Sequence, residues 1–573
     1  MSSSHAGPDG SLIFAGARYR AELTPDGRRL VLAAPDGTLL VILRPLAALD
    51  RIDAHDETTA VDPPVLVDQR TAEVRRRSTI WGEARCTITC REESIEISTS
   101  VEGTGALGDV RLLAVRSLVP RTPQGLVPSG TPLPALFSPG PSEPARRTRP
   151  TLEPAFAGVT GDGEPGRGRW LFTPPPLWFG LGDDSRGDWL GLGLAAPVED
   201  LRFVEAAYEA AEGGFAVRLE YDGHTTVEGR FEAPTVVLTP GLSDPFAGIR
   251  AHREDLVARR FSPPPTPREL PGWWREPIFC GWGAQCDLAR GTGRFAGELA
   301  TQEHYDAFLD RLEREGLVPG TVVIDDKWQT AYGTNEPDAA KWPDLAGWIA
   351  QRHARGQRVL LWWKAWDPEG LPRELCVRNP AGDPVAVDPG NPATREEIRR
   401  QLAALLSAEG LDADGLKIDF TARTPRGRAV ASEGGAWGIA LLHELLATVY
   451  GAAKEAKADA LVITHTPHPG FADVTDMIRL NDVLSPAGAG LPVVEQMELR
   501  AEVARAACPE LLIDTDDWPI GDLDAWRAYA ERKVEIGVPS LYYAGRLDAR
   551  GDSFTSEDYE LLRRTWSRWR GQS

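Results

Sequence analysis

The most constraining feature of the sequence is a regular alternation of two patterns over its second half. Short apolar runs of β character recur eight times, and amphipathic helical segments such as 300–316 and 438–456 lie between them. Eight buried strands separated by helices over about 300 residues match the count and length of a (β/α)8 TIM barrel. The runs are 277–283, 321–326, 358–363, 414–420, 460–465, 476–482, 510–515 and 539–545.

The first half of the chain has a different pattern of apolar and polar residues. Segments such as 86–90 and 94–101 are short, mostly alternating in polarity and separated by turn residues, which is typical of an antiparallel β-sandwich. A Pro-dense segment then interrupts both helix and strand and suits a linker. We therefore predict an N-terminal β-sandwich over 1–261, a linker over 262–272 and a barrel over 273–573.

Composition and charge restrict the partners of this protein. The chain has 63 Lys+Arg against 84 Asp+Glu, a formal charge of −21, which argues against nucleic acid as a partner. No apolar run reaches the ~20 residues that cross a bilayer, and the opening residues lack the features of a signal peptide. The six cysteines fit no zinc spacing and suit buried thiols in a reducing compartment. We expect a soluble, cytoplasmic protein that binds neither nucleic acid nor membrane.

Polar and aromatic side chains gather where the predicted barrel strands end. Catalytic groups of such barrels lie at the carboxyl ends of the strands, so these side chains are the candidate site. In strand order they are Asp325, Asp326 and Trp328, then Trp362, Trp363, Lys364 and Trp366, then Lys417 and Asp419, then His465, then Arg479 and Asp482, and finally Asp514, Asp516, Asp517 and Trp518.

These residue types point to a sugar. Paired carboxylates hydrogen-bond vicinal hydroxyls, and indole rings cover the apolar face of a pyranose. Two further acids that flank a glycosidic bond can supply a nucleophile and an acid/base. A neighbouring Lys or Arg keeps the nucleophilic carboxylate ionised. The strand ends therefore predict a barrel that processes a small carbohydrate.

Three motifs also resemble a known family. Residues 324–329 read IDDKWQ, residues 415–420 read GLKIDF, and residues 478–482 read IRLND. In order and position they resemble the motifs of glycoside hydrolase clan D, families 27 and 36, which hold the α-galactosidases (melibiases) and raffinose synthases. The resemblance implies retaining cleavage of an α-glycoside, with an α-galactoside as the first guess. It also implies that Asp419 is the nucleophile and Asp482 the acid/base.

The sequence departs from that family in three places. Lys327 stands where a Gly is usual, and the loop 464–470 replaces a Cys/Gly-rich one. The chain also ends soon after the eighth strand, so we expect a barrel without the usual C-terminal β-domain, with self-association into a homo-oligomer as one way to cover that flank. Because of these departures, the identity of the sugar stays open. One alternative is another α-pyranoside, or one with an anionic group that Lys327 or Lys364 would bind. A raffinose-synthase-type transglycosidase and a non-catalytic carbohydrate-binding homologue are also compatible with the motifs.

Several individual residues admit more than one role. Trp362 and Trp363 point to opposite faces of a strand, so only one can meet the sugar, and Trp363 is our choice. Asp476, Asp516 and Asp517 are rivals to Asp482 as the acid. The predicted substrate-binding set is Asp325, Asp326, Trp328, Trp363, Lys364, Trp366, Lys417, Arg479, His465, Asp516 and Trp518.

No metal or organic cofactor is predicted. His465 and His468 form an H-x-x-H spacing, but a proline lies between them in a loop, which makes a poor metal pair. No glycine-rich phosphate loop occurs in a strand–turn–helix setting.

Overall fold

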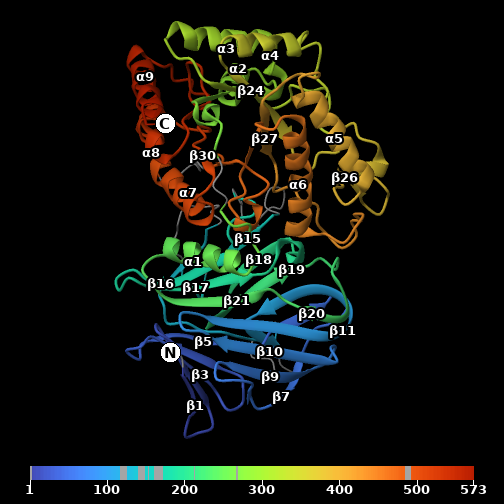
Figure 1. The fold of residues 1–573 in the computed structure, drawn as a ribbon, viewed down its shortest axis with the longest axis vertical. Helices are drawn as coiled ribbons and strands as arrows, with labels where there is room; N and C mark the ends of the chain where they lie inside the picture. Colours follow the sequence, from blue (N-terminus) through green and yellow to red (C-terminus); the bar gives the residue numbers. More distant parts are fainter. Residues whose placement is uncertain are drawn as a thin grey trace.

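The chain forms layered antiparallel sheets that are followed by a parallel barrel (Figure 1). A computed structural model describes residues 3–116, 125–139, 149–152, 154–159, 172–211, 213–265, 269–483 and 492–572. The fold class predicted from the sequence, an antiparallel β region followed by an eight-stranded barrel, is confirmed.

Two sheets and a small ribbon make up the N-terminal region. A five-stranded antiparallel sheet contains, in spatial order, β1 (Ser3–Ala6), β2 (Leu12–Ala15), β3 (Arg20–Leu23), β4 (Leu30–Ala33) and β5 (Leu39–Leu43). The larger sheet follows the path β14 (Ala135–Phe137), β16 (Trp178–Asp183), β17 (Asp188–Ala195), β21 (Thr235–Leu242), β11 (Ile95–Leu112), β10 (Glu83–Cys90), β9 (Thr71–Ser78) and β7 (Thr58–Val61). Off this path lie β6 (Ala48–Arg51), β8 (Val65–Leu66), β15 (Ala155–Gly158), β18 (Glu205–Ala211), β19 (Gly214–Glu220) and β20 (Thr226–Glu232), while β12 (Ala114–Arg116) pairs with β13 (Leu126–Pro128).

The long strand β11 connects the parts of this region. Its first residues pair with β10 and β21, and its last residues pair with β6 and β19. The period-two pattern read from the sequence is visible in β10, where Cys86, Ile88 and Cys90 are buried and alternate with half-buried residues. Alternation of this kind is what packs one face of a sheet against a second layer.

The barrel strands occur in the order in which the sequence predicts them. Around the barrel they are β22 (Ile278–Cys280), β23 (Thr321–Ile324), β24 (Arg358–Lys364), β27 (Gly415–Asp419), β28 (Leu461–Thr464), β29 (Met477–Arg479), β30 (Leu512–Asp514) and β31 (Ser540–Leu541). A parallel bridge between Asp514 and Val538 joins the seventh strand to the eighth. Because all strands are parallel, their carboxyl ends lie at one mouth of the barrel.

Helices cover the outside of the barrel, and the first helix packs on three neighbouring strands of the large sheet, β16, β17 and β21. The helices are α1 (Pro245–Ala258), α2 (Trp282–Ala289), α3 (Gln302–Arg314), α4 (Leu345–Ala354), α5 (Pro392–Leu406), α6 (Gly438–Ala456), α7 (Val493–Ala507), α8 (Leu523–Ile536) and α9 (Ser556–Arg570). Side-chain caps start several of them, as when Asp344 accepts a hydrogen bond from Gly347 N and Asp522 accepts one from Ala525 N. A short ribbon, β25 (Cys376–Arg378) with β26 (Pro384–Val387), projects between β24 and α5.

One connection differs from a complete (β/α)8 barrel. Between β28 and β29 the described chain forms only a short 3-10 turn, Pro469–Phe471. Two prolines, Pro467 and Pro469, remove backbone donors there and prevent an α-helix. Helix α1, which precedes the barrel in sequence, contacts this turn and α7.

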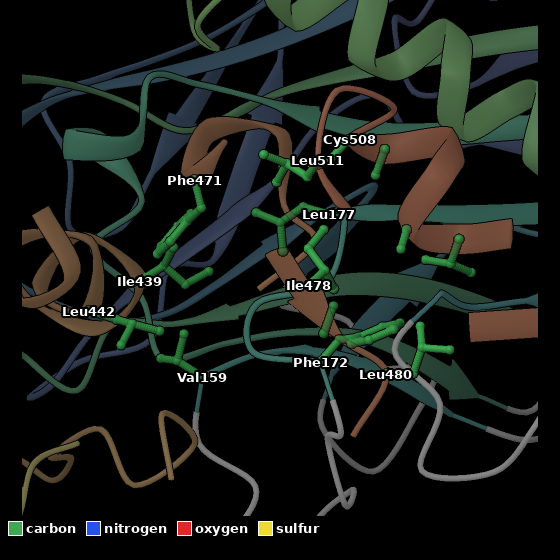
Figure 2. Packing of buried hydrophobic residues seen from close by; sticks show 14 of the residues in the cluster. Val159, Phe172, Leu177, Ile439, Leu442, Phe471, Ile478, Leu480, Cys508 and Leu511 are labelled. Carbon is green, nitrogen blue, oxygen red and sulfur yellow. The ribbon is translucent and has the colours of Figure 1, made fainter. Parts of the chain in front are cut away.

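The β region packs against the mouth end of the barrel. Side chains from both parts join one hydrophobic cluster, with Val159, Phe172 and Leu177 on one side and Ile439 and Ile478 on the other (Figure 2). Polar contacts cross the same junction: Thr173 N donates to His465 O at 3.1 Å, and Gly427 N donates to an Asp222 carboxylate oxygen at 2.8 Å. The β region therefore supports the loops that follow the fourth and fifth strands.

The predicted linker makes contacts of its own. Ser262 donates a hydrogen bond from its hydroxyl to Pro469 O at 2.7 Å, while residues 266–268 lie outside the described part. The division into a β-sandwich, a linker and a barrel stays a prediction. Among the described helices, none is both long and apolar enough to pass through a bilayer.

Candidate functional site

The centre of the candidate site is the Arg479 guanidinium at the end of β29. One terminal nitrogen donates to Asp419 Oδ1 at 3.0 Å. The other donates to Asp482 Oδ1 at 3.2 Å and to Asp516 Oδ2 at 2.6 Å. Arg479 and Asp516 are buried, whereas 24% of the Asp419 side chain and 44% of the Asp482 side chain remain exposed. Buried Asp516 thus fixes a cation that two accessible carboxylates share.

The two accessible carboxylates have opposite pKa shifts. Burial alone would raise the pKa of Asp419, but the charges of Arg479 and Lys417 outweigh it and hold that pKa well below its usual range. The loss of surrounding water in the partly enclosed mouth raises the pKa of Asp482 to about 6, and the nearby Asp516 and Asp419 carboxylates add to this rise, whereas Arg479 opposes it. Near neutral pH, Asp419 is therefore an anion while Asp482 titrates close to the working range.

Asp419 is further oriented by its own strand and by β24. Phe420 N donates to Asp419 Oδ1 at 2.8 Å, and the indole Nε1 of Trp362 donates to Oδ2 at 3.3 Å. The indole at Asp419 is thus that of Trp362. Trp363 lines a separate small cavity with Tyr332 and Lys364, and its contact with a sugar stays a prediction.

A second carboxylate, Asp325, is held in a buried ion pair. Lys417 Nζ lies 2.7 Å from Asp325 Oδ2, and the Cys280 thiol donates to the same oxygen at 3.0 Å. Burial disfavours the Lys417 ammonium, but the Asp325 charge outweighs it and raises the pKa of Lys417. This buried ion pair lies below the mouth of the barrel and fixes the position of the Asp325 carboxylate.

The adjacent Asp326 has a different environment. The Tyr332 hydroxyl donates to Asp326 Oδ1 at 2.8 Å, and burial raises the pKa of Asp326 to about 6. The ammonium groups of Lys327 and Lys364 each lie 3.9 Å from the centre of the Tyr332 ring. Nothing in the sequence pattern marks Tyr332, because it lies in a loop beyond the end of the predicted strand.

Both of these lysines already have anionic partners. Lys327 Nζ lies 2.7 Å from Glu369, and Lys364 Nζ lies 2.8 Å from Asp367. Each ammonium is therefore neutralised locally rather than presented alone to the mouth.

Two predicted tryptophans are core residues of the mouth. Trp328 is fully buried and donates from Nε1 to Trp362 O at 2.8 Å. Trp366 is buried and donates from Nε1 to Thr421 O at 3.0 Å. Both indoles are thus buried, unlike the accessible Asp419 and Asp482, and each forms a hydrogen bond to the backbone at the end of another barrel strand. Their contact with a sugar stays a prediction.

His465 lies behind Asp419 and contacts the β region. Its Nε2 is hydrogen-bonded to the Thr421 hydroxyl at 2.5 Å, and that hydroxyl in turn contacts the Thr173 hydroxyl. Burial, with the charge of Arg479 nearby, lowers the pKa of His465 to about 3, so the ring is neutral. His468 instead accepts a hydrogen bond from Gly470 N, and the described residues hold no cluster of three or more metal-ligating side chains.

Trp518 lies at the exposed side of the mouth. Its Nε1 donates to Asp548 Oδ2 at 3.0 Å, and its ring meets that of Trp282 edge-on at 5.8 Å. Asp517, two positions before the cis Pro519, is fully buried against Lys533.

Backbone strain is concentrated at the same strand ends. Lys327, Trp366, Phe420, Asn481 and Asp516 adopt positive φ values of 69°, 72°, 60°, 68° and 53°. Each follows a barrel strand by one to three residues, in a region that non-glycine residues avoid. Such conformations persist where surrounding contacts enforce them, and they cluster at functional sites.

Comparisons with known proteins agree with this fold. No family model and no curated protein matches the sequence. A GH31 sulfoquinovosidase from E. rectale, solved with an aza-sugar inhibitor, matches with a TM-score of 0.57 at 13% identity, over 97% of this chain and 81% of that one. A GH31 α-xylosidase from a soil metagenome matches with a TM-score of 0.55 at 12% identity, over 99% and 76%.

A third match is an α-galactosidase from Thermus thermophilus in complex with stachyose. It gives a TM-score of 0.50 at 17% identity, over 82% of this chain and 96% of that chain. At these identities the likeness is one of fold. Because two of the three enzymes belong to GH31, the comparisons do not single out clan D, families 27 and 36.

Proposed function

We propose that this protein is a retaining α-glycosidase in which Asp419 is the nucleophile and Asp482 the acid/base. The observation that carries the proposal is the shared Arg479 guanidinium, with two accessible carboxylates of opposite pKa shift on it. A pair of acids whose environments separate their pKa values is the arrangement that general acid–base chemistry requires. The glycosidase neighbours of the same fold support the reaction class.

The first step follows from the contacts of Asp419. Its Oδ1 is occupied by Arg479 and Phe420 N, which leaves Oδ2, with one long indole contact, as the attacking atom. The bond from Oδ2 to the anomeric carbon forms while the bond to the leaving oxygen breaks, and Asp482 gives its proton to that oxygen. In the second step the Asp482 carboxylate takes a proton from water, whose oxygen displaces Asp419.

Asp482 suits the acid role better than its rivals. Asp476 is fully buried at the opposite end of β29, where it binds Lys454, Tyr450 and Val462 N. Asp516 and Asp517 are fully buried on Arg479 and Lys533. Among these four acids only Asp482 combines a raised pKa with substantial exposure.

The glycone side is formed by Asp325 and Asp326. Adjacent carboxylates, supported by Lys417 and Tyr332, can accept hydrogen bonds from neighbouring sugar hydroxyls. We infer a neutral α-pyranoside, with an α-galactoside as first choice. The pairing of Lys327 with Glu369 and of Lys364 with Asp367 makes an anionic sugar the weaker alternative.

The test is hydrolysis of a panel of nitrophenyl α- and β-glycosides and α-glycosyl fluorides, including anionic sugars. Wild type should hydrolyse one α-glycoside and release the α-anomer first. Asp419→Ala should be inactive and should form a β-glycosyl azide when azide is added. Transfer to a sugar acceptor in preference to water would assign a transglycosidase, and sugar binding without turnover across the panel would overturn the enzymatic proposal.

A further inference from the structure

Three aromatic side chains form a partly exposed rim beside the mouth of the barrel. We call Trp282, Phe295 and Trp518 the aromatic rim. Trp282 meets Trp518 at 5.8 Å and Phe295 at 6.4 Å, with interplanar angles of 75° and 62°. Phe295 is 49% exposed, and the two tryptophans are half-buried. The two tryptophans therefore pack against the core on one side, while the rim leaves part of its ring surface exposed to solvent.

The Trp518 ring has a fixed orientation. Its indole N–H is bound by Asp548 Oδ2, and the buried Tyr543 hydroxyl donates to the other oxygen of Asp548 at 3.0 Å. Trp518 N also donates to Asp516 Oδ1, the residue that holds Arg479. An aromatic ring ordered before binding loses little conformational freedom when a ligand stacks on it.

The rim lies on the side of the acid/base. Val483 N, next to Asp482, donates to Trp518 O at 2.8 Å, so the loop that carries the acid runs along Trp518. This hydrogen bond places Trp518 beside the loop that carries Asp482, within reach of a group bound at that carboxyl.

We propose that the aromatic rim is the leaving-group subsite and takes a second pyranose ring of an α-linked oligosaccharide. The inference rests on the proposed function, because Asp482 protonates the bridging oxygen and must lie beside the departing sugar. When the bond from the anomeric carbon to that oxygen breaks, the proton from Asp482 makes the departing group a neutral alcohol. The apolar C–H face of that sugar packs on indole, which holds it while the bond breaks.

The test compares two substrates that share one glycone. An α-linked disaccharide fills the leaving-group subsite, whereas the α-glycosyl fluoride of the same pyranose places no ring there. Trp518→Ala should lower kcat/KM for the disaccharide about tenfold and change it for the fluoride by less than about twofold. Trp518→Phe keeps a stacking ring and should retain most of the activity on the disaccharide.

Trp282→Ala tests the same subsite from a different element and should act in the same direction. Trp273→Ala is the matched control, because Trp273 is a half-buried tryptophan that precedes β22 at the other end of the barrel and donates to Asp459. It should leave both substrates unchanged.

The outcomes separate the two proposals. Equal losses on both substrates, or no loss on the disaccharide for Trp518→Ala and Trp282→Ala, overturn the leaving-group subsite while wild-type turnover upholds the glycosidase. Absence of wild-type turnover on every fluoride and glycoside overturns the proposed function itself. If Trp518→Ala does not fold, Trp282→Ala gives the same comparison of the two substrates, and no loss of kcat/KM on the disaccharide in that variant overturns the subsite.

Discussion

Aspartates lie at both ends of the barrel, but their burial and their hydrogen-bond partners differ between the two ends. Strand β27 is preceded by Asp414 and ends in Asp419, and β29 is preceded by Asp476 and followed by Asp482. At the amino end, Asp414 binds His353 at 2.7 Å, Arg358 at 3.1 Å and Lys457 at 3.2 Å. It also accepts from Val359 N at 2.8 Å. At the mouth, three carboxylates share the single guanidinium of Arg479.

The difference separates acids that stabilise the fold from the acids that we propose carry out the chemistry. Asp414 and Asp476 are at most 1% exposed and have several cationic or backbone partners each. Asp419 and Asp482 are accessible and share their main cation, so their protonation and reactivity remain adjustable. Mutations at the amino end should therefore lower the stability of the protein, whereas mutations at the mouth should lower its activity.

The largest effect is expected at Asp419, the proposed nucleophile. Asp419→Asn should lower kcat by about 10⁴-fold or more on an activated α-glycoside, because no other group can form the covalent intermediate. The melting temperature should move by only a few degrees, since Arg479 keeps its ion pairs with Asp482 and Asp516. Residual activity above one per cent in a contaminant-free preparation would assign the nucleophile elsewhere.

Asp482, the proposed acid/base, should determine the pH dependence of kcat/KM. A carboxyl with a pKa of about 6 donates its proton only below that pH, so kcat/KM should fall as the pH rises through about 6. Asp482→Asn should remove this alkaline limb and cost about 10³-fold on a substrate that needs protonation. Asp326 has a raised pKa of about 6 as well, so Asp326→Asn is the control and should keep the limb. Loss of the limb in Asp326→Asn alone would transfer the acid role to Asp326.

The opposite end should respond through stability. Asp476→Ala leaves Lys454 and Val462 N without their carboxylate partner, so it should cost about 3 kcal/mol in the free energy of unfolding. The kcat of the folded fraction should stay near the wild-type value, as measured by activity after denaturant titration. A loss of kcat at unchanged stability would contradict the claim that acids at the amino end serve only to stabilise the fold.

The smallest effect is expected at Lys327. Its φ of 69° suits glycine, so Lys327→Gly relieves strain while it removes the Glu369 ion pair and loosens the loop. We expect a change within about 1 kcal/mol in the free energy of unfolding and within about twofold in kcat/KM for a neutral α-glycoside. A selective loss of kcat/KM on an anionic sugar would instead show that Lys327 binds the anionic group of the substrate.

The strands and most barrel helices could be predicted because apolar periodicity is local. The run 358–363 became β24, and the segment 438–456 became α6 at the expected ends. Between β28 and β29 the structure has only a short turn, in the place where the sequence predicts the loop 464–470, because two prolines there prevent an α-helix.

The site was predictable in outline but not in its contacts. The strand ends predict that Asp419, Asp482 and Arg479 lie near one another, and the structure brings them into contact, but strand parity alone cannot choose between Trp362 and Trp363. Barrel tilt and packing determine which indole faces Asp419. Tyr332 and Thr173 reach the mouth from a loop and from the β region, so no local pattern could mark them.

The most direct test of the proposed mechanism is covalent trapping of the nucleophile. The wild-type protein is incubated with the 5-fluoro-α-glycosyl fluoride of the pyranose that it hydrolyses, digested and analysed by mass spectrometry. We predict one glycosyl adduct per chain on the peptide that contains Asp419, and none in Asp419→Asn. An adduct on Asp482 or Asp326, or turnover with immediate release of the β-anomer, would contradict the mechanism.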